Sequence, residues 1–271
     1  MRPLDGRRIA LLESRKSGEL AGLVQRLGGT TISAPSVQEV QRSDDISIFV
    51  DGLAARRFQF VIFLTGVGAT SVLEQAGRRD ALDQSLEALR RATIICRGPK
   101  PIAALKRYGL SPGIVTPTPH TSVELLQALA AIELTDATVL LVHYGERNDA
   151  LADGLRRRGA NLSEVCPYEW QLPPDVSPLE SMIEETICGR VDALLFTSQV
   201  QCRHLIHVAQ TSGKRDTLVS VLNRDVVLGA IGPVCADSLR AAGLKPDVIP
   251  AAPNMASLIT AVGDYFELVR D

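Results

Sequence analysis

Aromatic side chains and an excess of either charge are what this 271-residue sequence most clearly lacks. Aromatic residues make up 4% of it, and 29 lysines and arginines against 31 aspartates and glutamates leave a formal net charge of −2. Few rings are available for stacking on nucleic-acid bases, and no overall charge attracts the chain to DNA, RNA or an anionic membrane. Nucleic acids and membranes are therefore not expected as partners, and an anionic ligand would need local arginines and backbone amides.

Long hydrophobic runs and a cysteine framework are also missing. No apolar segment approaches the roughly 18–20 residues of a membrane-spanning helix. The five cysteines are odd in number and scattered, mostly among apolar residues, which is typical of reduced thiols rather than of disulfides. With 45% hydrophobic residues, the chain is long enough for two domains that each bury a core. These features predict a cytoplasmic protein of two domains.

The chain also lacks two short motifs that are typical of common enzyme classes, the P-loop of nucleotide-binding proteins and the G-x-S-x-G nucleophile elbow of hydrolases. Residues 65–71 have the glycine spacing G-x-G-x-x-S, half of a dinucleotide fingerprint, but the next expected strand ends in Cys96-Arg97 instead of an acid. We interpret this segment as a tight turn from strand to helix. Cys202, His204 and His207 do not share one helix face, so a helix surface is favoured over a metal site.

What the sequence does contain is an internal duplication. Landmarks recur in the same order after 131 to 134 residues: Gly28 as Gly159, Thr65 as Thr197, Pro99 as Pro233, and Gly109 as Gly243. Two similar halves commonly face one another across a cleft, and clefts between domains bind ligands. The duplication therefore predicts a binding site built from corresponding parts of the two repeats.

Short runs of Val, Ile and Leu alternate with segments of helical period. Unbroken apolar strands separated by helices are typical of parallel sheets covered on both faces, so the sequence predicts an α/β protein with doubly wound parallel-sheet domains. The expected strands are residues 9–13, 30–34, 60–65, 93–97 and 113–116, then 138–144, 162–166, 193–197, 226–231 and 248–250.

Helix ends and linkers can also be located. Gly28 and Gly159 are expected to end equivalent helices, and Thr121 with Glu124 has the spacing of a capping box. The most irregular stretches, 34–47 and 166–178, lie at equivalent points of the two repeats. Both are candidate linkers, so the chain is expected to cross between the domains twice.

Several residues at strand ends could bind a carboxylate or phosphate, because ligands of open α/β sheets bind beyond the carboxyl ends of the strands and at helix N-termini. Lys100 could bind a carboxylate, although a solvated surface lysine is an equal alternative, and His143 is more safely interpreted as structural. The candidates are Arg15, Thr65, Gly66, Gly98, Lys100, Arg147, Thr197, Ser198 and Gly232.

The ordered set of motifs resembles the uroporphyrinogen-III synthase family. The resemblance lies in residues 192–198, in 230–233 continuing into 239–243, in Val165-Cys166-Pro167-Tyr168, and in the strand followed by arginine around Arg15. It implies two α/β domains joined by a two-stranded linker. One domain would comprise residues 1–35 and 173–271 and the other residues 41–165, with linkers near 36–40 and 166–172.

The same resemblance implies a lyase without a cofactor, working as a monomer in tetrapyrrole synthesis. Its small-molecule substrate would be hydroxymethylbilane, a linear tetrapyrrole with eight carboxylates, which loses its terminal hydroxyl as water. Ring closure inverts the last pyrrole through a spiro intermediate. Tyr168 matches the family's linker tyrosine and is our candidate proton donor, while the strand-end residues named above would hold the carboxylates.

The sequence departs from the family pattern at hydroxyl-bearing positions. Gly66 stands where many synthases have serine, and Gly232-Pro233-Val234-Cys235 and Gly98-Pro99-Lys100-Pro101 both lack the threonine of Gly-Pro-x-Thr. A non-catalytic sensor that binds a tetrapyrrole or small anion in the same fold is therefore an alternative. A nucleotide-dependent enzyme is a third reading, which requires nicotinamide or flavin binding.

Overall fold

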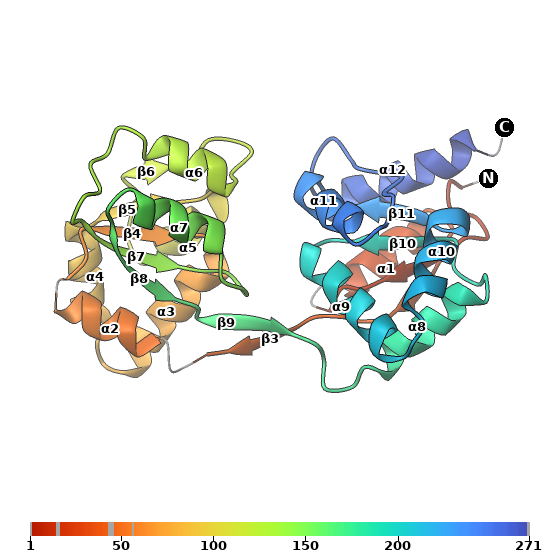
Figure 1. The fold of residues 1–271 in the computed structure, drawn as a ribbon, viewed down its shortest axis with the longest axis horizontal. Helices are drawn as coiled ribbons and strands as arrows, with labels where there is room; N and C mark the ends of the chain where they lie inside the picture. The colour runs from red at the N-terminus through yellow and green to blue at the C-terminus, as the bar shows by residue number, and fades with distance from the viewer. Residues whose placement is uncertain (1, 15–16, 43–45, 56, 270–271) are drawn as a thin grey trace. The chain divides into compact units, whose positions relative to one another are not determined.

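The computed structural model describes residues 2–14, 17–42, 46–55 and 57–269 (Figure 1). The chain divides into two compact units, one of residues 1–38 with 171–271 and one of residues 39–170. Within the described residues, no helix is both long enough and apolar enough to cross a membrane.

The unit of residues 39–170, here called the central unit, is built on a five-stranded sheet in the order β6-β5-β4-β7-β8. Every neighbouring pair in this sheet is parallel. The strands are β4 (Phe60–Phe63), β5 (Thr93–Cys96), β6 (Ile114–Val115), β7 (Thr138–Val142) and β8 (Asn161–Val165).

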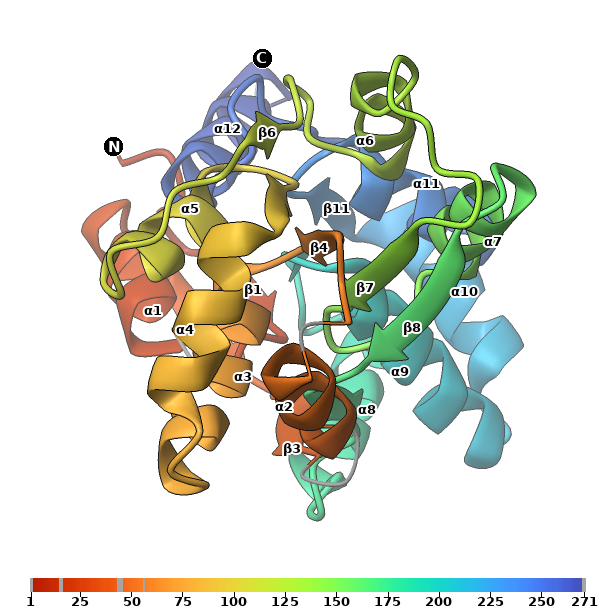
Figure 2. The same cartoon turned by 90° about the vertical axis from the view of Figure 1, so that its left-hand side faces the viewer.

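Helices cover both faces of this sheet (Figure 2). Alternate strand residues such as Val61 and Phe63 pack with α2 (Ile46–Ala54), α3 (Gly66–Arg78), α4 (Leu82–Arg91) and α5 (Pro99–Lys106). Ile62 and Leu64 point the other way and pack with α6 (Ser122–Ala128) and α7 (Asp149–Arg157). Buried strands therefore carry apolar residues at every position, which is why they occur as continuous hydrophobic runs.

The other unit, here called the terminal unit, has a four-stranded parallel sheet in the order β11-β10-β1-β2. Its strands are β1 (Arg8–Leu11), β2 (Thr30–Ser33), β10 (Ala193–Phe196) and β11 (Val227–Ala230). One face packs with α1 (Ser17–Arg26) and α12 (Met255–Leu268). The other packs with α8 (Ser177–Ile187), α9 (Gln199–Thr211), α10 (Arg215–Asp225) and α11 (Pro233–Ala241).

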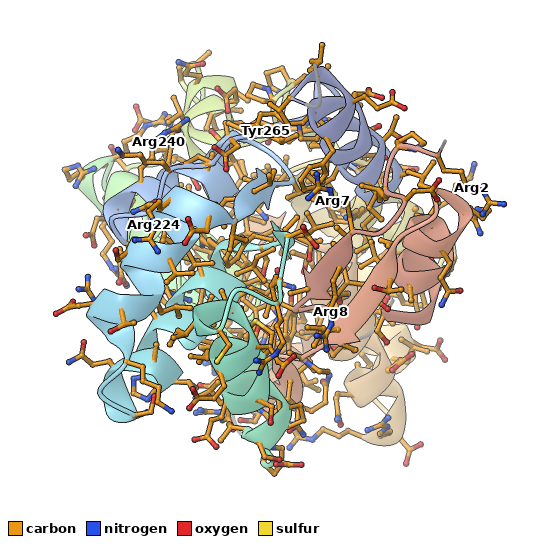
Figure 3. The ribbon with its side chains drawn as sticks, turned by 90° about the vertical axis from the view of Figure 1, so that its right-hand side faces the viewer. Arg2, Arg7, Arg8, Arg224, Arg240 and Tyr265 are labelled. Atoms are coloured by element: carbon orange, nitrogen blue, oxygen red, sulfur yellow. The ribbon has the colours of Figure 1, made fainter. Side chains whose placement is uncertain are left out.

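Ion pairs fasten the first strand of the terminal unit. The guanidinium of Arg7 lies 2.7 Å from the carboxylate of Asp192 and stacks over the ring of Phe266, and Arg8 lies 2.8 Å from Glu185 (Figure 3). Both arginines precede or open β1, so they connect residues more than 170 positions away in the sequence to the N-terminal strand.

The two sheets show how the repeats are interleaved. β1 and β2 of the first repeat pair with β10 and β11 of the second, whereas β4, β5 and β6 of the first pair with β7 and β8 of the second. Each sheet therefore takes two strands from the start of one repeat and its remaining strands from the other repeat. The prediction of an α/β fold with parallel sheets and an internal duplication is confirmed.

One expected strand, residues 248–250, is wrong. Only a single parallel bridge joins Val248 to Gly229 at this place, which corresponds to β6 of the central unit. Pro246 precedes the segment and Pro250 is its last residue, and proline supplies no N–H to continue a ladder.

Two further strands lie in the expected linkers. β3 (Gln38–Gln41) and β9 (Tyr168–Gln171) form a two-stranded sheet and run in opposite directions (Figure 1). The expected linkers, residues 36–40 and 166–172, overlap these strands. The expected domain boundaries stay a prediction, which limited proteolysis can test.

The expected helix ends are confirmed. Thr121 and Glu124 form the capping box that opens α6. Gly28 and Gly159 follow α1 and α7 with φ values of 91° and 81°, a left-handed backbone that glycine adopts without steric cost.

Candidate functional site

Tyr168 is the first residue of β9 and is only 2% exposed. Its phenolic oxygen lies 3.2 Å from the hydroxyl oxygen of Thr65, which follows β4. Burial raises the pKa of Tyr168 above its usual value, while the hydrogen bonds to Thr65 and to the backbone of Gly145 act in the opposite direction. The phenol is therefore neutral at physiological pH and keeps its O–H available as a donor.

One aromatic ring packs against Tyr168, and a second ring packs against the first. Trp170, two positions along β9 and thus on the same strand face, has its ring centroid 6.2 Å from that of Tyr168 and 5.5 Å from that of Tyr144. Gly145 is required beneath the indole, because a Cβ there would lie 2.1 Å from Trp170 Cδ2. The backbone N–H of Trp170 donates to the Gly145 carbonyl over 2.9 Å, so β9 is held against the loop that follows β7.

Arg97 stands at the carboxyl end of β5 in the same neighbourhood. Its guanidinium lies 4.7 Å from the centroid of the Tyr144 ring. Burial lowers the pKa of Arg97, whereas Tyr144 and, more weakly, Tyr168 raise it. Within the described part of the chain no carboxylate pairs with this half-buried cation, and its partners are phenol rings.

The loop after β7 is anchored by His143, which is 1% exposed. Its Nε2 lies 2.8 Å from a Glu164 carboxylate oxygen, and its Nδ1 accepts the backbone N–H of Asn148 over 3.1 Å. Because Nδ1 accepts, the ring is neutral with its proton on Nε2. Burial lowers the pKa of His143, and this outweighs the opposite effect of Glu164. The residue has the structural role expected of it.

The start of α3 requires a threonine-like cap at position 65 and a glycine at position 66. Thr65 is the N-cap residue, and its hydroxyl accepts the backbone N–H of Gly68 over 3.0 Å. A Cβ at Gly66 would lie 2.7 Å from the carbonyl oxygen of Lys100, so the close packing of α3 against α5 requires glycine there. The missing hydroxyl at position 66 is thus a consequence of backbone packing in this chain.

Gly98 is the N-cap of α5 with an extended φ of 175°. A Cβ there would approach the ring of His120 to 3.3 Å. Lys100 lies in the first turn of α5 and is exposed. It lines a cavity of about 440 Å³ between α3 and α5, together with Gly66 and Arg107.

In the terminal unit, Thr197, Ser198 and Gly232 occupy matching strand ends. The Thr197 hydroxyl donates to Glu13 over 2.7 Å, and the backbone N–H groups of Thr197 and Ser198 both donate to Gln201 Oε1. Ser198 and Gln201 form the capping box of α9. Gly232 is the N-cap of α11, where Pro233 takes the first helical position.

Of the two arginine candidates, Arg147 and Arg15, only Arg147 lies within the described residues. Arg147 follows β7 and pairs with Glu164 over 2.8 Å and with Asp149 over 3.0 Å, while its side chain is 55% exposed. Arg156 also pairs with Glu164. Arg15 lies outside the described residues.

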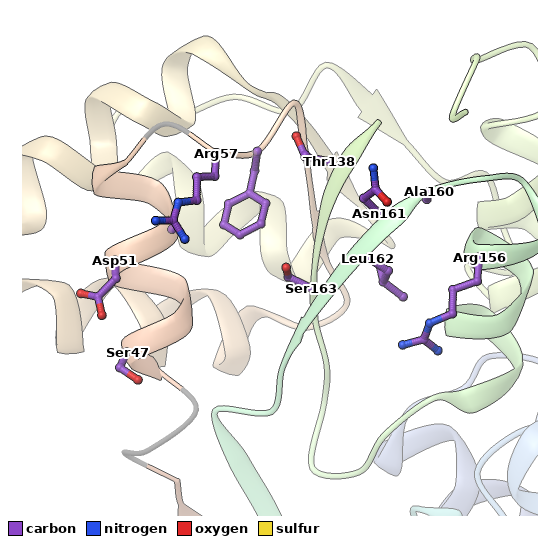
Figure 4. A pocket seen from close by; sticks show the side chains of 11 residues that line it. Ser47, Asp51, Arg57, Thr138, Arg156, Ala160, Asn161, Leu162 and Ser163 are labelled. Carbon is purple, nitrogen blue, oxygen red and sulfur yellow. The ribbon is translucent and has the colours of Figure 1, made fainter. Parts of the chain in front are cut away.

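Another cavity, of about 660 Å³, lies elsewhere on the central unit. It is lined by α2 and the amino ends of β7 and β8, with Arg57 and Arg156 on either side (Figure 4). It contains none of the expected site residues. Ligands of open α/β sheets bind at the carboxyl ends of the strands, so the Tyr168 neighbourhood is the better candidate.

The cysteines and histidines of α9 do not assemble a metal site. His204 Nδ1 lies 2.6 Å from the carbonyl oxygen of Ser36, and Cys202 is buried. Across the described residues, no cluster of three or more His, Cys, Asp or Glu side chains could hold a metal ion.

Comparison with known proteins gives the family. Residues 18–260 match the family model described as uroporphyrinogen-III synthase HemD. The chain belongs to the uroporphyrinogen-III synthase family. Its fold is similar to a mutant uroporphyrinogen III synthase of the extremely thermophilic bacterium Thermus thermophilus, with a TM-score of 0.79, 26% identity, and coverage of 98% of this chain and 100% of that one.

Two sequence relatives span nearly the whole chain. The uncharacterized protein YjjA of Bacillus subtilis is 29% identical over 267 residues, which is 97% of each chain. A Methanothermobacter thermautotrophicus protein that provisionally bears the name uroporphyrinogen-III synthase is 28% identical over 252 residues, 92% of this chain and 96% of that one.

Within this synthase family fold, sequence reasoning missed Tyr144, Trp170 and Arg97 as neighbours of Tyr168. Trp170 could have been found, because residues two apart on a strand share a face. The stacking of Arg97 on Tyr144 could not, since it joins the ends of two strands that are separated by 47 positions in the sequence.

Proposed function

We propose that this chain catalyses the cyclisation of hydroxymethylbilane to uroporphyrinogen III, with loss of water and inversion of the terminal pyrrole, as a cofactor-free monomer. Family membership and the fold support this assignment. The observation that carries it is the hydrogen bond between Thr65 and the buried phenol of Tyr168 at the end of β4. It supplies a proton donor where ligands of α/β sheets bind.

Tyr168 acts as the proton source for the leaving hydroxyl. Hydroxide is far more basic than a phenolate, since bulk water has a pKa of about 15.7. A phenol can therefore protonate the departing group even though burial raises its pKa. The remainder of the catalysis is positioning of a substrate that cyclises readily once the hydroxyl has left.

Thr65 carries that proton from the buried phenol to the substrate. Its hydroxyl oxygen accepts from the Gly68 N–H and, in this orientation, from the Tyr168 O–H. A threonine oxygen has two acceptor sites and one proton, so the Thr65 O–H remains for the leaving group. Thr65 is half-buried whereas Tyr168 is 2% exposed, so Thr65 is the member of the pair that substrate can touch.

The substrate carboxylates bind at the strand ends of both units. In the central unit these are Gly66, Gly98 and Lys100; in the terminal unit, Thr197, Ser198 and Gly232. The N–H groups of Thr197 and Ser198 already donate to Gln201, so a carboxylate there must displace that side chain. Arg15 and Arg147 are proposed to add positive charge, Arg147 by exchanging its contacts with Glu164 and Asp149.

The test is the isomer formed from hydroxymethylbilane. Purified protein should yield the type III isomer faster than the spontaneous closure to type I. Tyr168→Phe should lower kcat by on the order of tenfold to a hundredfold, toward the lower end of general-acid effects. Tyr265→Phe, on α12 (Figure 3), is the matched control and should leave the rate unchanged.

Formation of type I alone at the uncatalysed rate would overturn the proposal. Saturable binding of a tetrapyrrole without turnover would instead establish the sensor as the function of this chain. Calorimetric binding of a nicotinamide or flavin nucleotide would favour the nucleotide-dependent enzyme.

A further inference from the structure

The amino terminus of α5 is poorly equipped to bind an anion. The first four N–H groups of a helix have no intrahelical acceptor and are the ones that hold anions. In α5 these positions are Gly98, Pro99, Lys100 and Pro101, and proline has no N–H. The corresponding start of α11 contains Pro233 alone. The start of α5 in the central unit thus has fewer backbone N–H donors than the corresponding start of α11 in the terminal unit.

A guanidinium stands directly before this helix. Arg97 is half-buried at the end of β5 and stacks on Tyr144 with 4.7 Å between its Cζ and the ring centroid. A buried charge is costly unless it is paired, and the described residues supply no carboxylate to Arg97. Tyr144 contacts this guanidinium with its ring and through a side-chain hydrogen bond. A guanidinium has five N–H donors, so donors remain for a planar anion.

We propose that Arg97 is a further carboxylate-binding residue, beside Gly66, Gly98 and Lys100, and that it holds one carboxylate side chain of the substrate by a bidentate ion pair. The inference rests on the proposed function for the identity of the ligand, a polycarboxylate tetrapyrrole. Arg97 adds a cationic donor where α5 has few backbone donors, and its contacts with Tyr144 restrict the movement of the guanidinium. Tyr144 in turn packs on Trp170, which packs on Tyr168.

The chain contains a single tryptophan, so Trp170 reports on this neighbourhood without labelling. Uroporphyrinogen III, an octacarboxylate, should change its fluorescence when titrated under anaerobic conditions. Arg97→Gln should weaken this binding at least about tenfold, the loss of one charge-assisted hydrogen-bonded pair, and raise KM for hydroxymethylbilane by a similar factor with a smaller change in kcat. Arg97→Lys should recover part of the affinity, because it restores charge without the fork.

Two controls separate binding from folding. Arg240→Gln removes an exposed arginine that pairs with Asp237 and should change neither titration nor KM. Arg97→Met keeps the packing on Tyr144 and removes an unpaired charge, so its melting temperature should equal or exceed that of the wild type. If Arg97 were purely structural, Arg97→Met would instead lower the melting temperature. The affinity of this variant for uroporphyrinogen III would then depend on salt concentration as that of the wild type does.

The outcomes distinguish this inference from the proposed function. If the wild type makes the type III isomer and Arg97→Gln has unchanged KM and affinity, the Arg97 assignment is wrong and the proposed function stands. If the wild type makes no type III isomer but binds uroporphyrinogen III in an Arg97-dependent manner, the assignment stands and the activity does not. Arg97-dependent binding of ADP or inorganic phosphate, without binding of uroporphyrinogen III, would overturn the carboxylate assignment.

Discussion

The hydroxyl oxygen of Thr65 and the phenolic oxygen of Tyr168 lie 3.2 Å apart, although 103 residues separate them in the sequence. The contact joins the turn after a central strand of the parallel sheet to the first residue of β9, which belongs to the separate two-stranded sheet. The same Thr65 oxygen caps α3. One hydroxyl thereby couples the helix start, the strand end and the candidate proton donor.

Replacing Thr65 should affect stability and activity together. Thr65→Val removes the N-cap and the partner of Tyr168, so the free energy of unfolding should fall by about 1–2 kcal/mol. If Thr65 relays the proton, kcat should fall at least as far as in Tyr168→Phe. Thr65→Ser retains the hydroxyl and should restore both properties, as measured by urea unfolding and the isomer assay. A Thr65→Val enzyme with normal kcat would exclude the relay.

The glycine at position 145 should be intolerant of any side chain. Gly145→Ala places a methyl group against the Trp170 indole, 2.1 Å from Cδ2 before any adjustment. The ring must move, and overpacking of this kind typically costs about 1–3 kcal/mol. We expect a shifted Trp170 emission maximum and reduced synthase activity. Gly109→Ala, where no atom lies within 4 Å of the added Cβ but φ is 68°, should destabilise the chain without changing the emission.

The free energy of unfolding should fall at acid pH because of His143. Its pKa is lowered in the folded protein from the usual 6.5, so below pH 6.5 the unfolded chain binds a proton more readily than the folded one. The stabilisation is complete above pH 6.5 and is lost as the pH falls toward the folded pKa. Glu164, Arg147 and Asp149 are the charged groups that affect this titration.

The measurement is the free energy of unfolding between pH 8 and pH 5. His143→Gln should flatten the acid decline, by up to about 1.4 kcal/mol per pH unit within the titration range. His207→Gln, at an exposed position of α9, should leave the decline in place. Parallel curves for the wild type and His143→Gln would show that His143 is not responsible. A further decline below pH 4.5 is expected in the wild type, because the pKa of Glu164 is also lowered from 4.5. This decline should be smaller in His143→Gln, since the hydrogen bond with His143 is one of the causes of the lowered pKa.

Thiol reactivity should follow burial. Desolvation raises the pKa of Cys96 and Cys235 to about 12 and that of Cys202 to about 11, so these thiols are protonated and inaccessible at pH 8. Cys188 is exposed and Cys166 is half-buried. A thiol reagent should therefore modify Cys188 rapidly, Cys166 slowly, and the other three only in denaturant.

Mass spectrometry of labelled peptides identifies each site, and Cys188→Ser should abolish the rapid phase alone. Rapid labelling of Cys235 in the native protein would mean that the start of α11 opens in solution. That result would contradict its place in the core of the terminal unit.

The alternation of apolar strands and amphipathic helices is local information, and the sequence therefore predicted the parallel α/β class and most strands. Gly28, Gly159 and the Thr121 capping box are likewise local, because backbone conformation and a three-residue spacing decide them. The strand predicted at residues 248–250 was wrong because apolar character alone does not make a strand. Pro246 and Pro250 have no N–H to donate to a neighbouring strand.

By itself, the sequence determined the fold class and the duplication, and it was enough to select Tyr168 as the candidate proton donor. Only the tertiary structure decided what surrounds that tyrosine. The neighbours of Tyr168 come from the ends of β4, β5 and β7, and these ends meet because parallel strands in one sheet present their carboxyl ends at one edge. Whether Arg97 has an acidic partner, and why position 66 must be glycine, depend on distances across that edge that no spacing along the chain encodes.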